Sequence, residues 1–174
     1  MGNNRSGESR GASLVELALA LPILIMLLVG MVSAGIAFNH ELALTHAARE
    51  GGRHAATLPV TNFASMDNWL NEVATQVVDD ATGTLASGVP GRYICVAYVH
   101  PNGTLASDST KSRIDTTSGI TYNSAPCFAD GRPNDERRVQ VEVRRDTDFD
   151  VVFFSSTINL DAPAVNRFEA GVGF

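Results

Sequence analysis

The apolar and polar positions divide the chain into a long apolar stretch near the N-terminus and a mixed remainder. No residue from Leu17 to Phe38 carries a charge. A helix over these residues would reach about 33 Å at ~1.5 Å per residue, close to the hydrocarbon thickness of a bilayer. The pattern therefore predicts a helix that spans a membrane once.

Basic residues precede this stretch. The polar leader in front of it holds Arg5 and Arg10, and Lys and Arg next to a span favour the cytoplasmic side of the membrane. We therefore expect the N-terminus to lie in the cytoplasm and the residues after the span to lie outside it.

The helical pattern continues beyond the apolar stretch, now with charged residues between the apolar ones. Small and apolar side chains keep a three- and four-residue spacing up to about Thr57, which predicts an amphipathic stalk that continues the span. Gly51 and Gly52 each disfavour a helix by ~1 kcal/mol relative to alanine, so we expect the helix to bend or thin there. A second amphipathic helix is predicted from about Ser65 to Ala86, with a serine or aspartate capping its start.

A β-rich run at 92–100, and alternating apolar and polar residues at 137–145 and 157–168, predict three later strands. Pro163 places the last of these at a sheet edge, because proline cannot donate a hydrogen bond to a neighbouring strand. The apolar run 149–154 fits either a strand or a loop that dips toward the membrane. The polar stretch 103–136 predicts a surface excursion, alone or with a minor hairpin.

These elements together predict an α+β protein. A long N-terminal transmembrane and stalk helix would carry a small head, built from the second amphipathic helix and an antiparallel sheet of three to four strands. The expected divisions of the chain are a leader at 1–11, the span and stalk at 12–57 and the head at 58–174.

The two cysteines of the chain, Cys95 and Cys127, fall within the predicted head. Disulfides persist outside the cytoplasm, so this location favours a bond between them that closes the polar stretch into a loop. In the chain-entropy model such a bond contributes ~3 to 4 kcal/mol to the free energy of unfolding. The alternative is two buried thiols that never meet.

Charge and motifs give little sign of chemistry. The net charge of −6 argues against a nucleic-acid surface. The four histidines lack metal-ligand spacing, and no motif of a hydrolase or of a phosphate-binding loop occurs. Asp146, Asp148 and Asp150 resemble the start of a calcium loop, but Val151 replaces the required glycine, so we interpret them as a solvated face. We expect no enzyme activity, no cofactor and no metal.

Glu16 does not fit a plain membrane anchor, because it lies directly against Leu17 at the start of the span. A carboxylate in mid-membrane costs ~2.5 to 3.5 kcal/mol on insertion scales and less near the interface, so its position suggests a cationic partner. Cleavage after Gly11 would create such a partner, since the new amine of Ala12 would lie one helical turn away.

The segment from Arg10 to Pro22, RGASLVELALALP, together with AAREGGR from Ala47 to Arg53, resembles the TadE-like pseudopilins of the tight-adherence (Tad/Flp, type IVc) pilus system. The spacing of Gly11 and Glu16 is similar to the processing motif of type IV prepilins. The resemblance implies cleavage between Gly11 and Ala12 by a membrane-embedded prepilin peptidase. Leu17 departs from the family, in which an aromatic residue is frequent at that position.

The resemblance implies a structural or assembly role and not an enzyme. The protein would be a minor pilin or pseudopilin of the bacterial cytoplasmic (inner) membrane, with its head outside, and would remain there or enter the pilus. Its partners would be the prepilin peptidase, other pilin-like subunits and the membrane, with Glu16 pairing to the amine of Ala12.

Small residues at Gly30, Ala34 and Ala37 share one side of the predicted span. They would let another helix approach closely, although glycine and alanine are common in any membrane helix, and both interpretations stay open.

Three alternatives remain beside the pilin interpretation. A secretory signal peptide cut near Gly35-Ile36-Ala37 would have a shorter apolar core than this stretch. A simple uncleaved anchor explains the span but gives Glu16 no role. The alternative function is an anchored extracytoplasmic binding domain, unrelated to pili, that uses the polar stretch for recognition.

Overall fold

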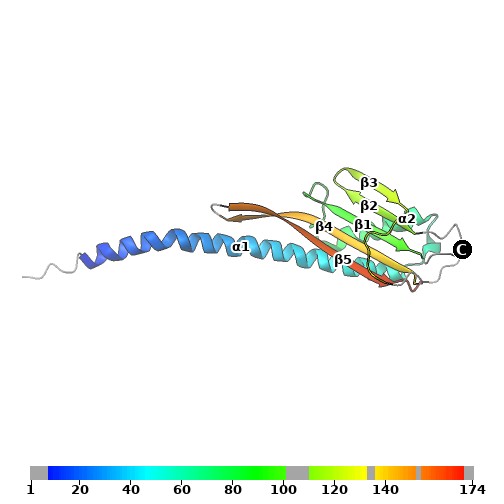
Figure 1. Cartoon of the computed structure of the whole chain (residues 1–174), viewed down its shortest axis with the longest axis horizontal. Helices are drawn as coiled ribbons and strands as arrows, with labels where there is room; N and C mark the ends of the chain where they lie inside the picture. Colours follow the sequence, from blue (N-terminus) through cyan, green and yellow to red (C-terminus); the bar gives the residue numbers. More distant parts are fainter. Residues whose placement is uncertain (1–7, 101–109, 133–135, 152–153, 171–174) are drawn as a thin grey trace, which may run out of the picture. The chain divides into compact units, whose positions relative to one another are not determined.

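The computed structural model describes residues 8–100, 110–132, 136–151 and 154–170. It contains, within these ranges, the helices α1 (Glu8–Thr57) and α2 (Met66–Asp80) and a short 3-10 helix, η1 (Val60–Asn62). The strands are β1 (Tyr93–Val99), β2 (Lys111–Thr116), β3 (Gly119–Asn123), β4 (Arg138–Val151) and β5 (Phe154–Arg167) (Figure 1). The predicted α+β fold class is confirmed.

The chain divides into two compact units. One comprises Met1–Ala37 with Asp148–Thr157, and the other comprises Phe38–Thr147 with Ile158–Phe174. The second half of α1 therefore belongs to the same unit as the sheet. We describe the two units separately.

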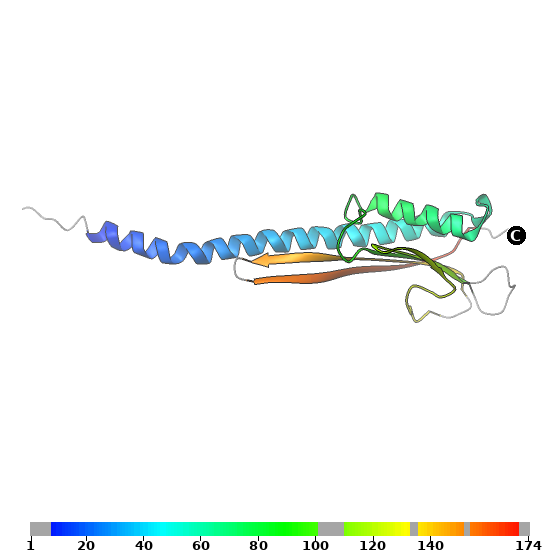
Figure 2. The same ribbon diagram turned by 90° about the horizontal axis from the view of Figure 1, so that it is seen from above.

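The larger unit packs helices against one face of the sheet. Figure 2 shows α2 and the C-terminal part of α1 on one side of the strands. Apolar side chains of the two helices, β1, β4 and β5 form the core between these layers; they include Leu44, Ala48, Trp69, Leu70, Val73, Val77, Ile94, Val96, Tyr98, Val139, Val141, Val143 and Phe168. Every second residue of β1 and β4 points into this core, as the alternation in the sequence requires.

The sheet has five strands in the order β3-β2-β1-β4-β5. β1 lies at its centre and pairs antiparallel with β2 on one side and with β4 on the other, so that Cys95 faces Ile114 and Glu142. β5 is an edge strand, where its Pro163 predicted it. The run 149–151 continues β4, and Phe154 begins β5, so these described residues are strand and not loop.

The sequence underestimated the sheet, because β2 and β3 come from the polar stretch 103–136. They pair antiparallel, and Gly119 at the start of β3 has a φ of 130°, a conformation that favours glycine. β2 is strongly polar, yet Ser112, Arg113 and Asp115 are buried in it. A strand buried through polar contacts carries no apolar alternation, and for that reason the pattern missed it.

Helix α2 begins where it was expected. The side chain of Ser65 caps it by accepting a hydrogen bond from the backbone N–H of Asn68 at 3.3 Å. It ends at Asp80, earlier than the predicted end near Ala86. The reason is local, because Thr82 and Gly83 adopt positive φ values of 47° and 87°, which leave the helical region.

The pair Gly51-Gly52 does not interrupt α1, which continues as a helix to Thr57. A Cβ added at Gly51 would overlap Cγ2 of Val77, and one added at Gly52 would overlap the side-chain amide of Asn166. The two glycines therefore allow α1 to approach α2 and β5 closely, at a cost in helix propensity that the packing offsets.

Candidate functional site

The N-terminal half of α1 is an apolar surface that this chain does not cover. From Ala12 the helix is long and apolar enough to cross a membrane, and none of its most apolar window is buried by the protein. Leu, Ile, Val and Met side chains between residues 14 and 36 stand exposed, whereas soluble proteins rarely leave large contiguous apolar patches open. Such a helix near the N-terminus is a membrane anchor or part of a signal sequence.

Glu16 lies on this apolar surface. Its side chain is exposed, and so are its neighbours Val15 and Leu17. Gly11 and Ala12 are part of the same continuous helix, since α1 starts at Glu8. Glu16 is thus a carboxylate among apolar neighbours. It lies five residues after Gly11, the glycine after which cleavage is expected.

Gly30, Ala34 and Ala37 differ in how far the described residues of the chain cover them. A Cβ built at Gly30 meets no heavy atom within 4 Å, and Ala34 is exposed while Ala37 is half-buried. Any tight helix contact at this stripe would have to come from another molecule, so the packing role of the three residues stays a prediction.

The last residues of β4 and the first residues of β5 lie beside the N-terminal half of α1. We call residues 148–151 and 154–157 the β4–β5 tip; both views show it beside α1, and it belongs to the same compact unit as Met1–Ala37 (Figures 1 and 2). The hydroxyl of Ser33 donates a hydrogen bond of 2.6 Å to the backbone carbonyl of Asp150. Sequence reasoning missed this contact. The sequence did contain a sign of this contact, because Ser33 is the only residue with a polar side chain between Leu17 and Phe38.

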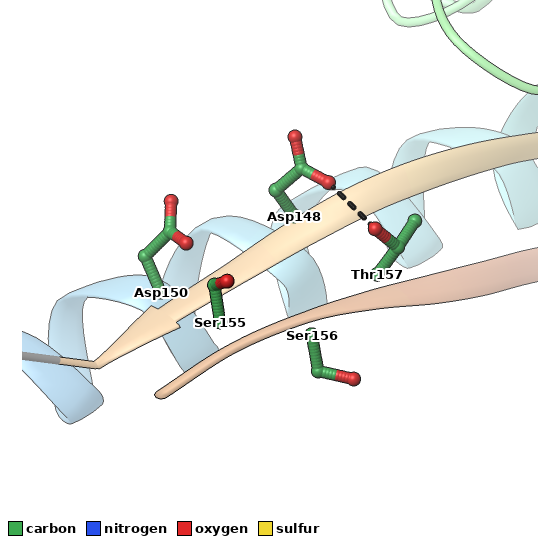
Figure 3. A pocket seen from close by; sticks show the side chains of 5 residues that line it. All are labelled: Asp148, Asp150, Ser155, Ser156 and Thr157. Atoms are coloured by element: carbon green, nitrogen blue, oxygen red, sulfur yellow. Dashed lines mark hydrogen bonds between the residues drawn. The ribbon is translucent and has the colours of Figure 1, made fainter. Parts of the chain in front are cut away.

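The outer side of the β4–β5 tip is polar. A shallow hollow of about 300 Å³ is lined by Asp148, Asp150, Ser155, Ser156 and Thr157 (Figure 3). The Thr157 hydroxyl donates to Oδ1 of Asp148 at 3.0 Å. Among the described residues no group of three or more His, Cys, Asp or Glu side chains is arranged to hold a metal ion. The hollow is thus a solvated acidic surface without the geometry of a cation site.

A disulfide joins Cys95 of β1 to Cys127, with the Cα atoms 5.8 Å apart. Gln140 of β4 holds the same segment, since its Oε1 accepts from the backbone N–H of Cys127 at 2.9 Å and its Nε2 donates to the carbonyl of Phe128 at 3.0 Å. The segment after Cys127 therefore covers the sheet face opposite the helices.

Asp130 completes this cover. Its carboxylate accepts hydrogen bonds from Nε of Arg138 at 2.6 Å and from Nε2 of Gln140 at 2.8 Å. Burial raises the pKa of the Asp130 carboxyl, but these hydrogen bonds, another from the backbone of Arg132, and the charge of Arg138 outweigh burial and hold the pKa below its ordinary value.

A second ionic cluster ties β2 to the rest of the unit. Both oxygens of the Asp115 carboxylate accept from the guanidinium of Arg92, at 2.6 and 3.0 Å, and Oδ2 also accepts from Arg113 at 3.1 Å. Arg113 donates in turn to Asn71 of α2 at 2.7 Å. Burial raises the pKa of Asp115, and the two arginines more than reverse that effect. These contacts, which sequence reasoning did not find, explain how a polar strand can lie next to β1.

Among the described residues, the N-terminal half of α1 forms a large exposed apolar surface that does not pack in the core. The class defined by these observations is a protein with one apolar N-terminal helix and an α+β head whose core is closed by α2, the sheet and the second half of α1.

Residues 11–53 match the family model described as "TadE-like protein". This N-terminal segment is therefore similar to TadE-like proteins, and the resemblance drawn from the sequence is confirmed over these residues. The match covers the apolar half of α1 and most of its packed half and ends before α2. No curated protein and no solved structure matches the chain.

Proposed function

We propose that the protein is a structural or assembly component, a minor pilin or pseudopilin, of a tight-adherence pilus and secretion apparatus. The observation that carries this proposal is the TadE-like match over residues 11–53, which coincides with a helix whose apolar surface is left uncovered. An exposed apolar surface of this kind contacts a membrane or other subunits, and the proposed pilus system contains both.

In this proposal the leader 1–11 is cytoplasmic and is removed by a prepilin peptidase. The mature chain starts at Ala12, its helix crosses the bacterial inner membrane, and the α+β head lies outside. Glu16 pairs with the amine of Ala12, on its own chain or on a neighbour, because an unpaired carboxylate beside hydrocarbon is costly. The stripe of Gly30, Ala34 and Ala37 receives a helix of another pilin-like subunit.

The role is non-enzymatic. The acidic hollow at the β4–β5 tip and the two ionic clusters of the larger unit hold their charges in hydrogen bonds between residues of the protein. They stabilise strands and a covering segment.

N-terminal sequencing of the protein isolated from membranes tests the proposal. We expect a chain that begins at Ala12. Replacing Gly11 with leucine should leave a longer chain that keeps its leader, because the peptidase site must accept a backbone with almost no side chain before the cut. Replacing Gly7 with leucine in the leader is the matched control and should leave cleavage unchanged.

Two outcomes would contradict the proposal. A chain that begins after Ala37 would identify a secretory signal peptide, and a chain that keeps residues 1–11 in cells with an active prepilin peptidase would identify a simple anchor.

A further inference from the structure

The contact between Ser33 and Asp150 ties the β4–β5 tip to the part of α1 that is expected to lie in the membrane. A serine within a helix commonly donates its hydroxyl to a carbonyl of the preceding turn. Ser33 donates instead to the carbonyl of Asp150, at 2.6 Å. The tip thus reaches the apolar span at its only polar side chain.

The two sides of the tip differ in polarity. Along β4 the side chains alternate, so that Phe149 and Val151 are half-buried while Asp148 and Asp150 are exposed. At the start of β5, the ring of Phe154 is 62% exposed. Among its described residues, the tip therefore exposes the apolar side chain of Phe154 and carries its carboxylates on the outside.

This polarity fixes where the tip can lie relative to a bilayer. If the hydrocarbon extended to Phe38, Ser33 would lie about 8 Å inside it at ~1.5 Å per residue. Asp148 and Asp150 would then face lipid, at a cost of ~2.5 to 3.5 kcal/mol each in mid-membrane and less toward the interface. An apolar ring with charged groups on the opposite side is instead accommodated at the boundary between headgroups and acyl chains.

We propose that the β4–β5 tip is a second membrane-contacting element, seated in the headgroup layer of the outer leaflet. Phe154 contacts the upper acyl chains, and Asp148 and Asp150 remain in the hydrated headgroup region. The outer limit of the hydrocarbon then lies near Ser33, not at Phe38. This inference rests on the membrane anchoring in the proposed function and adds the position of the chain in the bilayer.

The shifted boundary changes the surroundings of Glu16. A hydrocarbon layer of about 30 Å takes up roughly 20 helical residues, which counted back from Val32 reach Ser13. Glu16 then lies inside the inner edge of the hydrocarbon instead of at its border. Because the β4–β5 tip shifts this boundary, the carboxylate of Glu16 lies deeper in the hydrocarbon, where it costs more without a cationic partner.

Spin-label depth measurements on the full chain in phosphatidylcholine vesicles test the inference. Phe154→Cys reports on the tip, Leu28→Cys on the span, and Ile120→Cys on β3 is the matched control, because Ile120 is also an exposed apolar strand residue. The native disulfide leaves the engineered cysteine as the only free thiol in each variant among the described residues. The measured quantity is the ratio of oxygen to nickel-chelate collisions, which rises with depth.

We expect the ratio at position 154 to lie between a high value at 28 and a low value at 120. A ratio at 154 equal to that at 120, with a high value at 28, would overturn the inference and leave membrane anchoring intact. A low ratio at all three positions would overturn the anchoring itself. The two failures are therefore distinguishable.

The role of Ser33 has its own test in the same vesicles. Ser33→Ala removes the hydroxyl that holds Asp150, and we expect the ratio at position 154 to fall. Ser33→Thr keeps a hydroxyl and should preserve the ratio. An unchanged value in Ser33→Ala would overturn the claim that this hydrogen bond holds the tip at the bilayer.

Discussion

The two halves of α1 show opposite relations between hydrophobicity and burial. The N-terminal half is the more hydrophobic, and its Leu, Ile, Val and Met side chains are exposed. The C-terminal half is rich in alanine, glycine and charged residues, yet Leu44, Ala47, Ala48 and Ala55 are fully buried. Within α1, hydrophobicity therefore does not mark the buried half. Small residues mark it, because they let α1 approach α2 and the sheet closely.

The buried half of α1 makes contacts within the chain, whereas the exposed half offers a surface to other molecules. Burying an apolar side chain removes it from water whether the cover is this chain, another subunit or lipid. The buried half of α1 is covered by its own chain. The exposed half has no such cover among the described residues, so its partner must be another molecule.

Removal of the largest core side chain should have the largest effect on stability. Trp69 is fully buried, contacts Tyr98 and Phe168 edge to face, and donates its Nε1–H to the carbonyl of Leu58 at 3.0 Å. Trp69→Ala should lower the free energy of unfolding in detergent micelles by about 3 to 5 kcal/mol, measured by urea titration followed by circular dichroism. The exposed Phe154→Ala should change it by less than about 0.5 kcal/mol, and an equal loss in both variants would remove the distinction between the two units.

Loss of the disulfide should come next. The double substitution Cys95→Ser with Cys127→Ser should cost ~3 to 4 kcal/mol, because the unfolded chain regains the freedom of the loop between these residues. The fold itself should persist, since Gln140 and Asp130 still hold the covering segment. Electrophoresis without reductant provides the check on the native protein, which should migrate faster than after reduction. Two titratable thiols in the native protein would refute the bond.

The glycines of α1 test the comparison within one helix. Gly51→Val should cost about 1 to 3 kcal/mol, because the new side chain overlaps Val77 of α2. Gly30→Val is the matched control and should leave the unfolding of the head unchanged, since nothing lies within 4 Å of its added Cβ. Destabilisation by Gly30→Val to the same extent would show that the N-terminal half is packed by its own chain after all.

Acid should weaken the larger unit by a smaller amount. The carboxyl pKa values of Asp115 and Asp130 lie below the ordinary value of 3.8, so their contribution is fully present above that pH and is lost as the pH falls through the lower folded values. We expect the urea midpoint to stay level from pH 7 to about 5 and to fall below about pH 4.

A substitution checks the source of this acid effect. Asp115→Asn should flatten the dependence below pH 4, and Asp79→Asn, an exposed site on α2, should not. Parallel curves for the Asp115→Asn and native proteins would mean that this carboxyl does not contribute.

Strong periodicity and single-residue signals made much of the fold predictable. The 3.6-residue stripe gave both helices, Ser65 gave the cap of α2, a β-rich run gave β1, and strict alternation gave the first half of β4. The two cysteines allowed one pairing within the chain. Proline at position 163 correctly indicated an edge strand.

The early end of α2 has a local cause, but the other failures share one physical cause, namely contacts between residues distant in sequence. β2 is buried through the arginines that pair with Asp115, a cluster with no local signature. Gly51 and Gly52 look like helix breakers until the opposing Val77 and Asn166 are known. At the candidate site, the sequence indicated the span and Glu16, but only the fold brings Asp150 to Ser33.

The central claim is that the exposed half of α1 serves contact with other subunits in the membrane and that Glu16 organises this contact. Co-purification of pilin-like subunits with the Glu16→Ala protein tests it most directly, with Glu41→Ala, an exposed glutamate beyond the span on the same helix, as the matched control. Glu16→Ala should still insert and be cut, because removing a charge eases insertion. It should lose its partner subunits while Glu41→Ala retains them; recovery of the partners at the native level with the cut Glu16→Ala protein would contradict the claim.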